Sequence, residues 1–204
     1  MKKIGREVLF LSTGERNPRN GEGSLIRLND GRIMYAYTDY YGTEGDDHAT
    51  ARISAYYSSD EGESWVDGGV LVAKDEDALN IMSVSLLRMQ NGDLGVAYLR
   101  KSMKDNKLLC MPYFVRSSDE GKPFSEPICC IEKEGYYCTE TGCWLCKRCF
   151  SEFFSQQSRN ITEGDGNKHQ YGIFGFAPPI KGKGENKQLR VFKLLWYYKV
   201  QCQY

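Results

Sequence analysis

The sequence has no excess of charge of either sign, because its 27 Lys and Arg residues balance its 27 Asp and Glu residues. Balanced charge gives no electrostatic reason to expect nucleic acid or an anionic membrane as a partner. The sequence also lacks an apolar run as long as a membrane span or a signal peptide needs, since residues 8–11 form only a short one near the N-terminus. These absences predict a cytoplasmic protein that binds neither nucleic acid nor a membrane.

Cysteine is missing from the first half of the sequence. None of the eight Cys residues precedes Cys110, and five lie at or after Cys138. In a cytoplasmic protein these thiols are expected to be mostly reduced. The uneven distribution separates the last third of the chain from the rest.

One short motif occurs twice. Residues 58–65 read SSDEGESW and residues 117–124 read SSDEGKPF, so both copies follow the pattern S-x-D-x-G-x-x-aromatic. In such a turn the Asp carboxylate can accept backbone hydrogen bonds, and Gly allows a conformation that a Cβ would resist. Two copies indicate a repeated supersecondary unit. The residues that define the two turns are Ser58, Asp60, Gly62, Trp65, Ser117, Asp119, Gly121 and Phe124.

The residues around the two motifs predict an all-β fold. Aromatic residues make up 13% of the chain and favour strands, while Asn-Asp-Gly at residues 29–31 and Asn-Gly at residues 91–92 are hairpin turn signals. Each repeat therefore offers four antiparallel strands, as a β-propeller blade requires. The expected strands are residues 6–12, 24–28, 32–38, 52–58 and 66–73, followed by 83–89, 94–100 and 108–116.

Over residues 8–138 the chain resembles the N-terminal part of a bacterial sialidase-like protein of the BNR/Asp-box superfamily. The resemblance implies a six-bladed β-propeller, of which residues 1–138 would supply about two blades. It rests on the two Asp boxes at residues 58–65 and 117–124, and on residues 17–23 (NPRNGEG), 45–49 (GDDHA), 83–88 (SVSLLR) and 98–101 (YLRK).

The resemblance implies an exo-α-sialidase, a glycoside hydrolase that needs no cofactor and cleaves terminal sialic acid from a sialylated glycan or a related carbohydrate. Arg19 then takes the place of the first arginine that binds the substrate carboxylate, and Asp47 that of the acid/base. Glu22 and His48 would contact the substrate, and the Asp-box residues would be structural. The residues alone leave other interpretations open. Arg19 can be an ordinary loop arginine, and His48 a solvated loop histidine. Asp47 can belong to an Asx-type turn, with Asp46 as its competitor for the acid/base role.

The family takes its other catalytic groups, including the tyrosine nucleophile, from later blades. No convincing carrier of these groups follows residue 138, so we expect a truncated sialidase-like chain with little or no activity. A non-catalytic Asp-box module, either glycan-binding or structural, is the alternative. Two blades leave sheet edges uncovered, so self-association through these edges is also expected.

Residues 139–204 do not resemble the family and are rich in Cys, Gly and Lys. One interpretation is a metal or iron–sulfur site, because the spacing C-x4-C-x2-C-x2-C can supply four thiolates. The weak candidate ligands are Cys138, Cys143, Cys146 and Cys149.

The other interpretation of this segment is a shifted reading frame. Read one base earlier, residues 141–146 can encode Asn/Asp-Gly-Val-Leu-Val-Val, which is a turn followed by an apolar strand. In the same frame residues 178–183 can encode Ser-Ser-Asp-Lys-Gly-Lys, the start of an Asp box. We favour this interpretation, and therefore expect that the protein has no metal site and that the segment is shifted in frame or poorly ordered.

Overall fold

The computed structural model describes residues 6–137, 188–193 and 198–203, and every regular element in these ranges is a β-strand. The strands are β1 (Arg6–Leu11), β2 (Arg19–Arg27), β3 (Ile33–Tyr40), β4 (Ala51–Ser58), β5 (Val66–Val72), β6 (Ala78–Arg88), β7 (Leu94–Lys104), β8 (Lys107–Ser117), β9 (Ile128–Cys129), β10 (Gln188–Lys193) and β11 (Tyr198–Gln203). The prediction of an all-β fold is confirmed.

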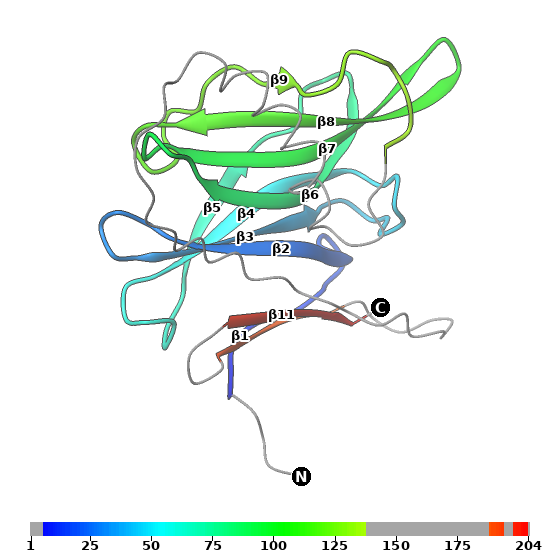
Figure 1. The fold of residues 1–204 in the computed structure, drawn as a ribbon. Helices are drawn as coiled ribbons and strands as arrows, with labels where there is room; N and C mark the ends of the chain where they lie inside the picture. The colour runs from blue at the N-terminus through cyan, green and yellow to red at the C-terminus, as the bar shows by residue number, and fades with distance from the viewer. Residues whose placement is uncertain (1–5, 138–187, 194–197, 204) are drawn as a thin grey trace.

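The strands form three antiparallel sheets (Figure 1). Two sheets have four strands each, in the orders β2-β3-β4-β5 and β6-β7-β8-β9, so each follows the chain as a simple meander. The third sheet joins β1 to β10 and β11. Four antiparallel strands per repeat match the arrangement that the sequence predicts for each of the two units.

The first described range ends at residue 137, and residues 138–187 lie outside the described residues. The four candidate metal ligands, Cys138, Cys143, Cys146 and Cys149, lie outside the described residues. Within the segment 139–204, β10 pairs with β1 and β11 pairs with β10. These two strands were not predicted.

Two strands begin earlier in the chain than the sequence predicts. β2 begins at Arg19 rather than at residue 24, and β6 begins at Ala78 rather than at residue 83. In both strands the pairing register shifts, between Asn20 and Gly23 and between Met82 and Ser85. A bulge interrupts the alternation of side chains that marks a strand, so each strand looks shorter in the sequence than it is.

Gly23 shows why the first bulge needs glycine. A Cβ at this position would lie 2.4 Å from the hydroxyl oxygen of Tyr35, whose side chain is completely buried. The strand β2 therefore passes directly over the Tyr35 ring, and only a residue without a side chain permits this approach.

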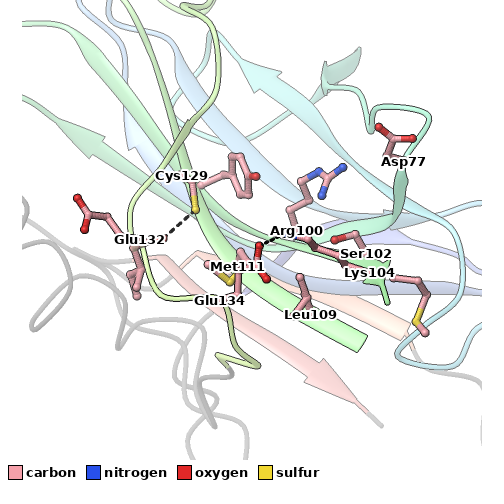
Figure 2. A pocket seen from close by; sticks show the side chains of 12 residues that line it. Asp77, Arg100, Ser102, Lys104, Leu109, Met111, Cys129, Glu132 and Glu134 are labelled. Carbon is pink, nitrogen blue, oxygen red and sulfur yellow. Dashed lines mark hydrogen bonds and ion pairs between the residues drawn. The ribbon is translucent and has the colours of Figure 1, made fainter. Parts of the chain in front are cut away.

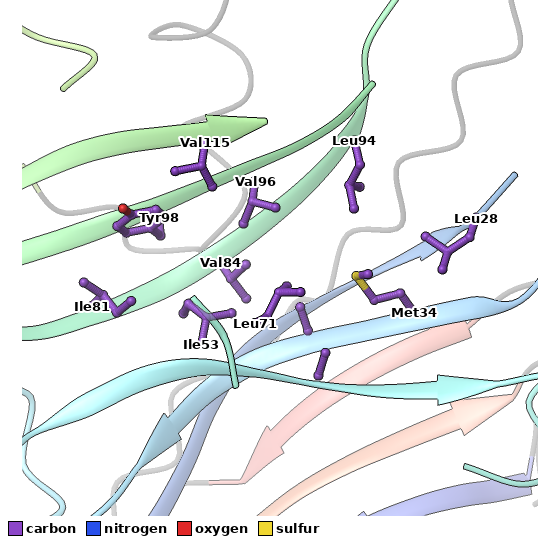
Figure 3. Close-up of a cluster of buried hydrophobic side chains, with 12 residues drawn as sticks. Leu28, Met34, Ile53, Leu71, Ile81, Val84, Leu94, Val96, Tyr98 and Val115 are labelled. Atoms are coloured by element: carbon purple, nitrogen blue, oxygen red, sulfur yellow. The ribbon is translucent and has the colours of Figure 1, made fainter. Parts of the chain in front are cut away.

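The two four-stranded sheets pack against each other through one apolar core (Figure 3). Both sheets contribute to it about equally, and full burial of a large aliphatic side chain contributes about 1.5–3 kcal/mol to folding. This core fixes the position of one sheet relative to the other. Its buried members are Leu28, Met34, Ala36, Ile53, Ala55 and Leu71 from the first unit, and Ile81, Val84, Leu94, Val96, Tyr98 and Val115 from the second.

In the first Asp box, the Asp60 carboxylate is the centre of the turn. Its Oδ1 accepts hydrogen bonds from the Ser64 backbone N–H and from the Ser58 hydroxyl, both at 2.8 Å. Its Oδ2 accepts a third from the Ser64 hydroxyl at 2.6 Å. The Ser58 hydroxyl oxygen also accepts the Gly62 N–H at 2.7 Å, and the indole N–H of Trp65 donates to the Gly62 carbonyl at 3.2 Å.

The second Asp box repeats only part of this network. The Ser117 hydroxyl oxygen accepts the N–H groups of Asp119 and Gly121, each at 3.1 Å. Pro123 stands where the first box has Ser64, and it has neither an N–H nor a hydroxyl to donate. Asp119 therefore lacks the bonds that surround Asp60, while the aromatic residue Phe124 packs against the core between the sheets.

Each Asp box also carries an ion pair that the sequence analysis did not predict. Arg27, at the end of β2, binds Glu61 through two hydrogen bonds of 2.8 and 2.7 Å. Arg88, at the end of β6, binds Glu120 in the same bidentate way at 2.8 and 2.9 Å. Arg88 also donates to the backbone carbonyl of Arg27 at 3.2 Å, which ties the two sheets together at this end.

The difference between the two boxes predicts a difference in acid stability. Hydrogen bonds from Ser64, then from Ser58, lower the pKa of Asp60 from 3.8 to about 2. Because the folded-state pKa lies below the unfolded one, this stabilisation is present above pH 4 and is lost as the pH falls toward 2. We expect Asp60→Ala to reduce the slope of stability against pH in this window.

Urea unfolding at a series of pH values from 2 to 5 measures this slope. Asp119→Ala is the matched control, because it removes the carboxylate at the same position of the second box, where Pro123 has no hydrogen bond to donate. Equal slopes for Asp60→Ala and the wild type would contradict the prediction.

Candidate functional site

The candidate residues lie at one end of the first sheet. Arg19 begins β2 and pairs in register with Tyr40, which ends β3. The loop 41–50 then leads from β3 to β4 and carries Asp46, Asp47 and His48. Strand pairing thus places Arg19 beside the start of this loop.

Arg19 is a buried strand residue, and its expected position in a loop is wrong. The residue is 2% exposed and lies in β2, paired with Tyr40 on the N-terminal side of the bulge. Its Nη1 donates to the Asp47 carboxylate and to the Gly45 carbonyl, and its guanidinium carbon lies 4.6 Å from the Tyr40 ring centroid. Burial by itself lowers the pKa of Arg19, but Tyr40, Asp47 and Glu22 more than offset this and raise it.

Asp47 faces the solvent although its partner is buried. Its side chain is 62% exposed, against 3% for the side chain of Arg19. The adjacent guanidinium favours the ionised carboxylate, which is an acceptor of hydrogen bonds only. In this arrangement Asp47 can accept hydrogen bonds from the hydroxyl groups of a ligand. Its predicted role as an acid requires that the hydrogen bond from Arg19 first be broken.

Two side chains of the second sheet hold the backbone of Asp47. Its carbonyl oxygen accepts hydrogen bonds from Lys101 Nζ at 2.5 Å and from Asn80 Nδ2 at 3.1 Å. Asn80 also donates to the Ala49 carbonyl at 2.9 Å. Asn80 and Lys101 are 0% and 3% exposed, so the loop of the first unit is anchored by buried polar groups of the second.

Glu22 and His48 have different surroundings. Glu22 lies in β2, half-buried, and is one of the groups that raise the pKa of Arg19. His48 is exposed, and its backbone N–H donates to Asp46 Oδ1 at 2.7 Å. Asp46 thus closes an Asx-type turn, whereas Asp47 is the carboxylate that reaches Arg19.

A buried carboxylate, that of Asp39, lies beside the site and was missed in the sequence. Asp39 is 5% exposed at the end of β3. Its Oδ1 accepts from Asn17 Nδ2 at 2.7 Å, and its Oδ2 accepts from Arg52 Nε at 2.8 Å and from the Ser54 hydroxyl at 2.7 Å. The only signal in the sequence is an acidic residue in the run 33–40, where all the other residues are apolar or aromatic except Thr38.

Within the described ranges no three His, Cys, Asp or Glu side chains are grouped so that they could hold a metal ion. The described part of the chain also contains no helix that is long and apolar enough to cross a membrane.

The chain matches no protein-family model and no curated protein. Similar solved structures include a protein of unknown function from Dyadobacter fermentans, with a TM-score of 0.50 at 15% identity, over 94% of this chain and 51% of that one. The Hadza microbial sialidase Hz136 gives a TM-score of 0.47 at 16% identity, over 61% of this chain and 28% of that one. The NanB sialidase from Streptococcus pneumoniae gives a TM-score of 0.44 at 9% identity, over 100% of this chain and 47% of that one.

The chain spans about half or less of the length of these solved structures. At 15% identity the likeness to the Dyadobacter protein concerns the fold alone, an all-β arrangement of antiparallel sheets.

Proposed function

We propose that the chain supplies part of the substrate site of a sialidase-like glycoside hydrolase, in which Arg19 binds the carboxylate of a terminal sialic acid and Asp47 is the acid/base. The observation that supports this proposal is the contact between these two side chains. The sequence resemblance gives one of them the carboxylate-binding role and the other the acid/base role. The two are 28 positions apart in the chain and lie against each other at one end of the first sheet.

The geometry indicates how a sialic acid would enter. A guanidinium binds a carboxylate through two parallel hydrogen bonds. On Arg19, one donor that a ligand carboxylate would use, Nη1, already donates to Asp47. A ligand carboxylate therefore competes with Asp47, and binding requires the exposed Asp47 side chain to move aside. After this exchange Asp47 no longer faces a cation, which is the condition under which it can carry a proton.

We expect the chain by itself to bind a sialoside rather than to hydrolyse it efficiently. The resemblance implies that the tyrosine nucleophile and the remaining arginines come from later blades, and no convincing carrier of these groups follows residue 138. The burial of Arg19 supports a second candidate function, a non-catalytic β-module in which the Arg19–Asp47 pair is structural.

Asp47→Asn tests the proposal through affinity. The substitution removes a negative charge that opposes the ligand carboxylate, so sialyllactose should bind about fivefold more tightly than to the wild type, which corresponds to about 1 kcal/mol. Any release of sialic acid by the wild type should be lost in this variant. Calorimetric titration and a released-sialic-acid assay measure the two effects.

Asp46→Asn is the matched control, because it removes the same charge one residue away. Its Oδ1 can still accept the His48 N–H, so the turn stays intact and the affinity for sialyllactose should not change. Lactose should bind neither variant. A wild type that binds neither sugar would refute the proposal and support the structural module.

A further inference from the structure

Lys101 is a buried cation beside the Arg19–Asp47 site. The residue lies in β7 and is 3% exposed, and its Nζ donates a hydrogen bond to the backbone carbonyl of Asp47 at 2.5 Å. Burial of an ammonium group is costly unless a carboxylate or several acceptors replace the water that it loses. The positive charge of Lys101 therefore needs an explanation from its surroundings.

The described surroundings of Lys101 offer no negative charge. In the part of the chain that the structure describes, no carboxylate forms an ion pair with its Nζ. Apart from the Asp47 carbonyl, its other described contact is the ring of Tyr136, whose centroid lies 5.8 Å from Nζ. An aromatic face attracts a cation at this distance, but it carries no net charge that could balance one.

The neighbouring cations of the second sheet differ in this respect. Arg100 precedes Lys101 in β7, so its side chain lies on the opposite face of the sheet, where it lines the cavity shown in Figure 2. Arg100 binds Asp75 there through two hydrogen bonds of 2.7 and 2.5 Å. Lys104, which lines the same cavity, binds Glu134. Each of these two charges is balanced by a carboxylate of the protein, and that of Lys101 is not balanced by any described one.

The hydrogen bond to the loop does not by itself require a charge. Asn80 in β6 pairs in register with Lys101, and its amide donates to the same Asp47 carbonyl at 3.1 Å. Asn80 is neutral and fully buried, so a neutral side chain already serves this acceptor. The property that distinguishes Lys101 is therefore its charge.

This charge lies close to the guanidinium of Arg19. Arg19 binds the side-chain carboxylate of Asp47 and Lys101 binds its backbone carbonyl, so the two cations lie within about 10 Å of each other. The charge of Arg19 is already opposed by the carboxylates of Asp47 and Glu22. A ligand carboxylate that approaches Arg19 would thus meet an arginine whose charge is largely offset and a lysine whose charge is not.

We propose that Lys101 is a specificity residue of the Arg19–Asp47 site, whose charge attracts the carboxylate of the ligand without touching it. The inference rests on the proposed function, because it takes the ligand to be a sialoside that binds Arg19. Unit charges about 10 Å apart, in an effective dielectric constant of about 20, change an equilibrium about tenfold. Because Asp47 faces the solvent, screening reduces the expected effect to about fivefold.

Titration of the full chain with sialyllactose and with its methyl ester tests this role. The two ligands differ in the charge of the carboxylate, so the ratio of their dissociation constants reports charge recognition and cancels any damage that weakens both alike. Lys101→Gln removes the charge and keeps a side-chain donor, and Lys101→Met removes both. In each variant the preference for the acid over the ester should fall about fivefold from its wild-type value.

Lys122→Gln is the matched control. It removes the same charge from an exposed position in the second Asp box, beyond the end of β8, whereas Lys101 pairs with Cys110 near the start of that strand. Its preference for the acid should equal that of the wild type. An unchanged preference in both Lys101 variants would overturn the role of Lys101 and leave the proposed function intact. A wild type that binds neither ligand, or binds both equally, would overturn the two proposals together.

Discussion

Asp39→Ala is expected to lower the free energy of unfolding by about 4 kcal/mol, a value typical of breaking a buried ion pair. The side chain accepts three hydrogen bonds at the end of β3, from Asn17, Arg52 and Ser54. The Ser54 hydroxyl is buried and would lose its acceptor, at a cost of about 1–3 kcal/mol. The Arg52 side chain is 38% exposed and can turn to water, which limits the loss.

Urea unfolding followed by tyrosine and tryptophan fluorescence measures this effect as a shift of the midpoint with an unchanged slope. Asp67→Ala is the surface control. Asp67 is exposed, and among the described residues its carboxylate accepts only the nearby Gly69 N–H at 2.8 Å, so we expect a change within about 0.5 kcal/mol. A comparable loss in both variants would mean that the network around Asp39 contributes no more than a surface turn does.

Asn80→Ala is expected to destabilise the protein by about 3 kcal/mol and to release the loop that carries Asp47. Asn80 is fully buried, and its amide donates to the carbonyls of Asp47 and Ala49. Removal of a buried donor costs about 1–3 kcal/mol for each acceptor left without it, and the vacated volume adds a cavity. Lys101 still binds the Asp47 carbonyl, so the loss at that acceptor is smaller.

Hydrogen exchange distinguishes this role from general destabilisation. In Asn80→Ala the amides of residues 41–50 should exchange faster than in the wild type, while those in the centre of β3 and β7 should change only with global stability. Asn91→Ala removes a side-chain amide from the exposed turn before β7. It should change neither the exchange of residues 41–50 nor that of the strand centres. Uniformly faster exchange across all strands would show that Asn80 does not act on the loop in particular.

Both effects concern residues that connect the site to the fold. Asp39 fixes the end of the strand that precedes the loop, and Asn80 holds the loop from the neighbouring sheet. The position of Asp47 therefore depends on the packing of the two units and not on the loop sequence alone. The apolar core between the sheets determines that packing.

Local chemistry explains what the sequence predicts. Alternation of apolar residues and the turn signals at residues 29–31 and 91–92 predict the centres of the strands, because side chains of a strand point to opposite faces in turn. The repeated Ser-x-Asp-x-Gly pattern predicts two similar turns, and the network around Asp60 follows from residues at most four positions apart. Substitution of Pro123 for a serine explains why the second turn differs.

Contacts between distant residues explain what the sequence does not predict. The bulges in β2 and β6 hide the first residues of both strands, so Arg19 has the sequence context of a loop and the environment of a core. Lys101 resembles a solvated charge at the end of a strand, yet it is buried against a carbonyl 54 positions away. No local pattern distinguishes these two cases.

The sequence by itself determined the all-β class, the two four-stranded units and the turns that close them, because these depend on neighbours along the chain. Only the tertiary structure decided that Arg19 is buried and that Asp47 lies on it. It also decided that Asn80 and Lys101 hold the Asp47 backbone. The physical reason is that burial and charge pairing depend on which sheet faces which, and that arrangement is set by the apolar core shared by both units.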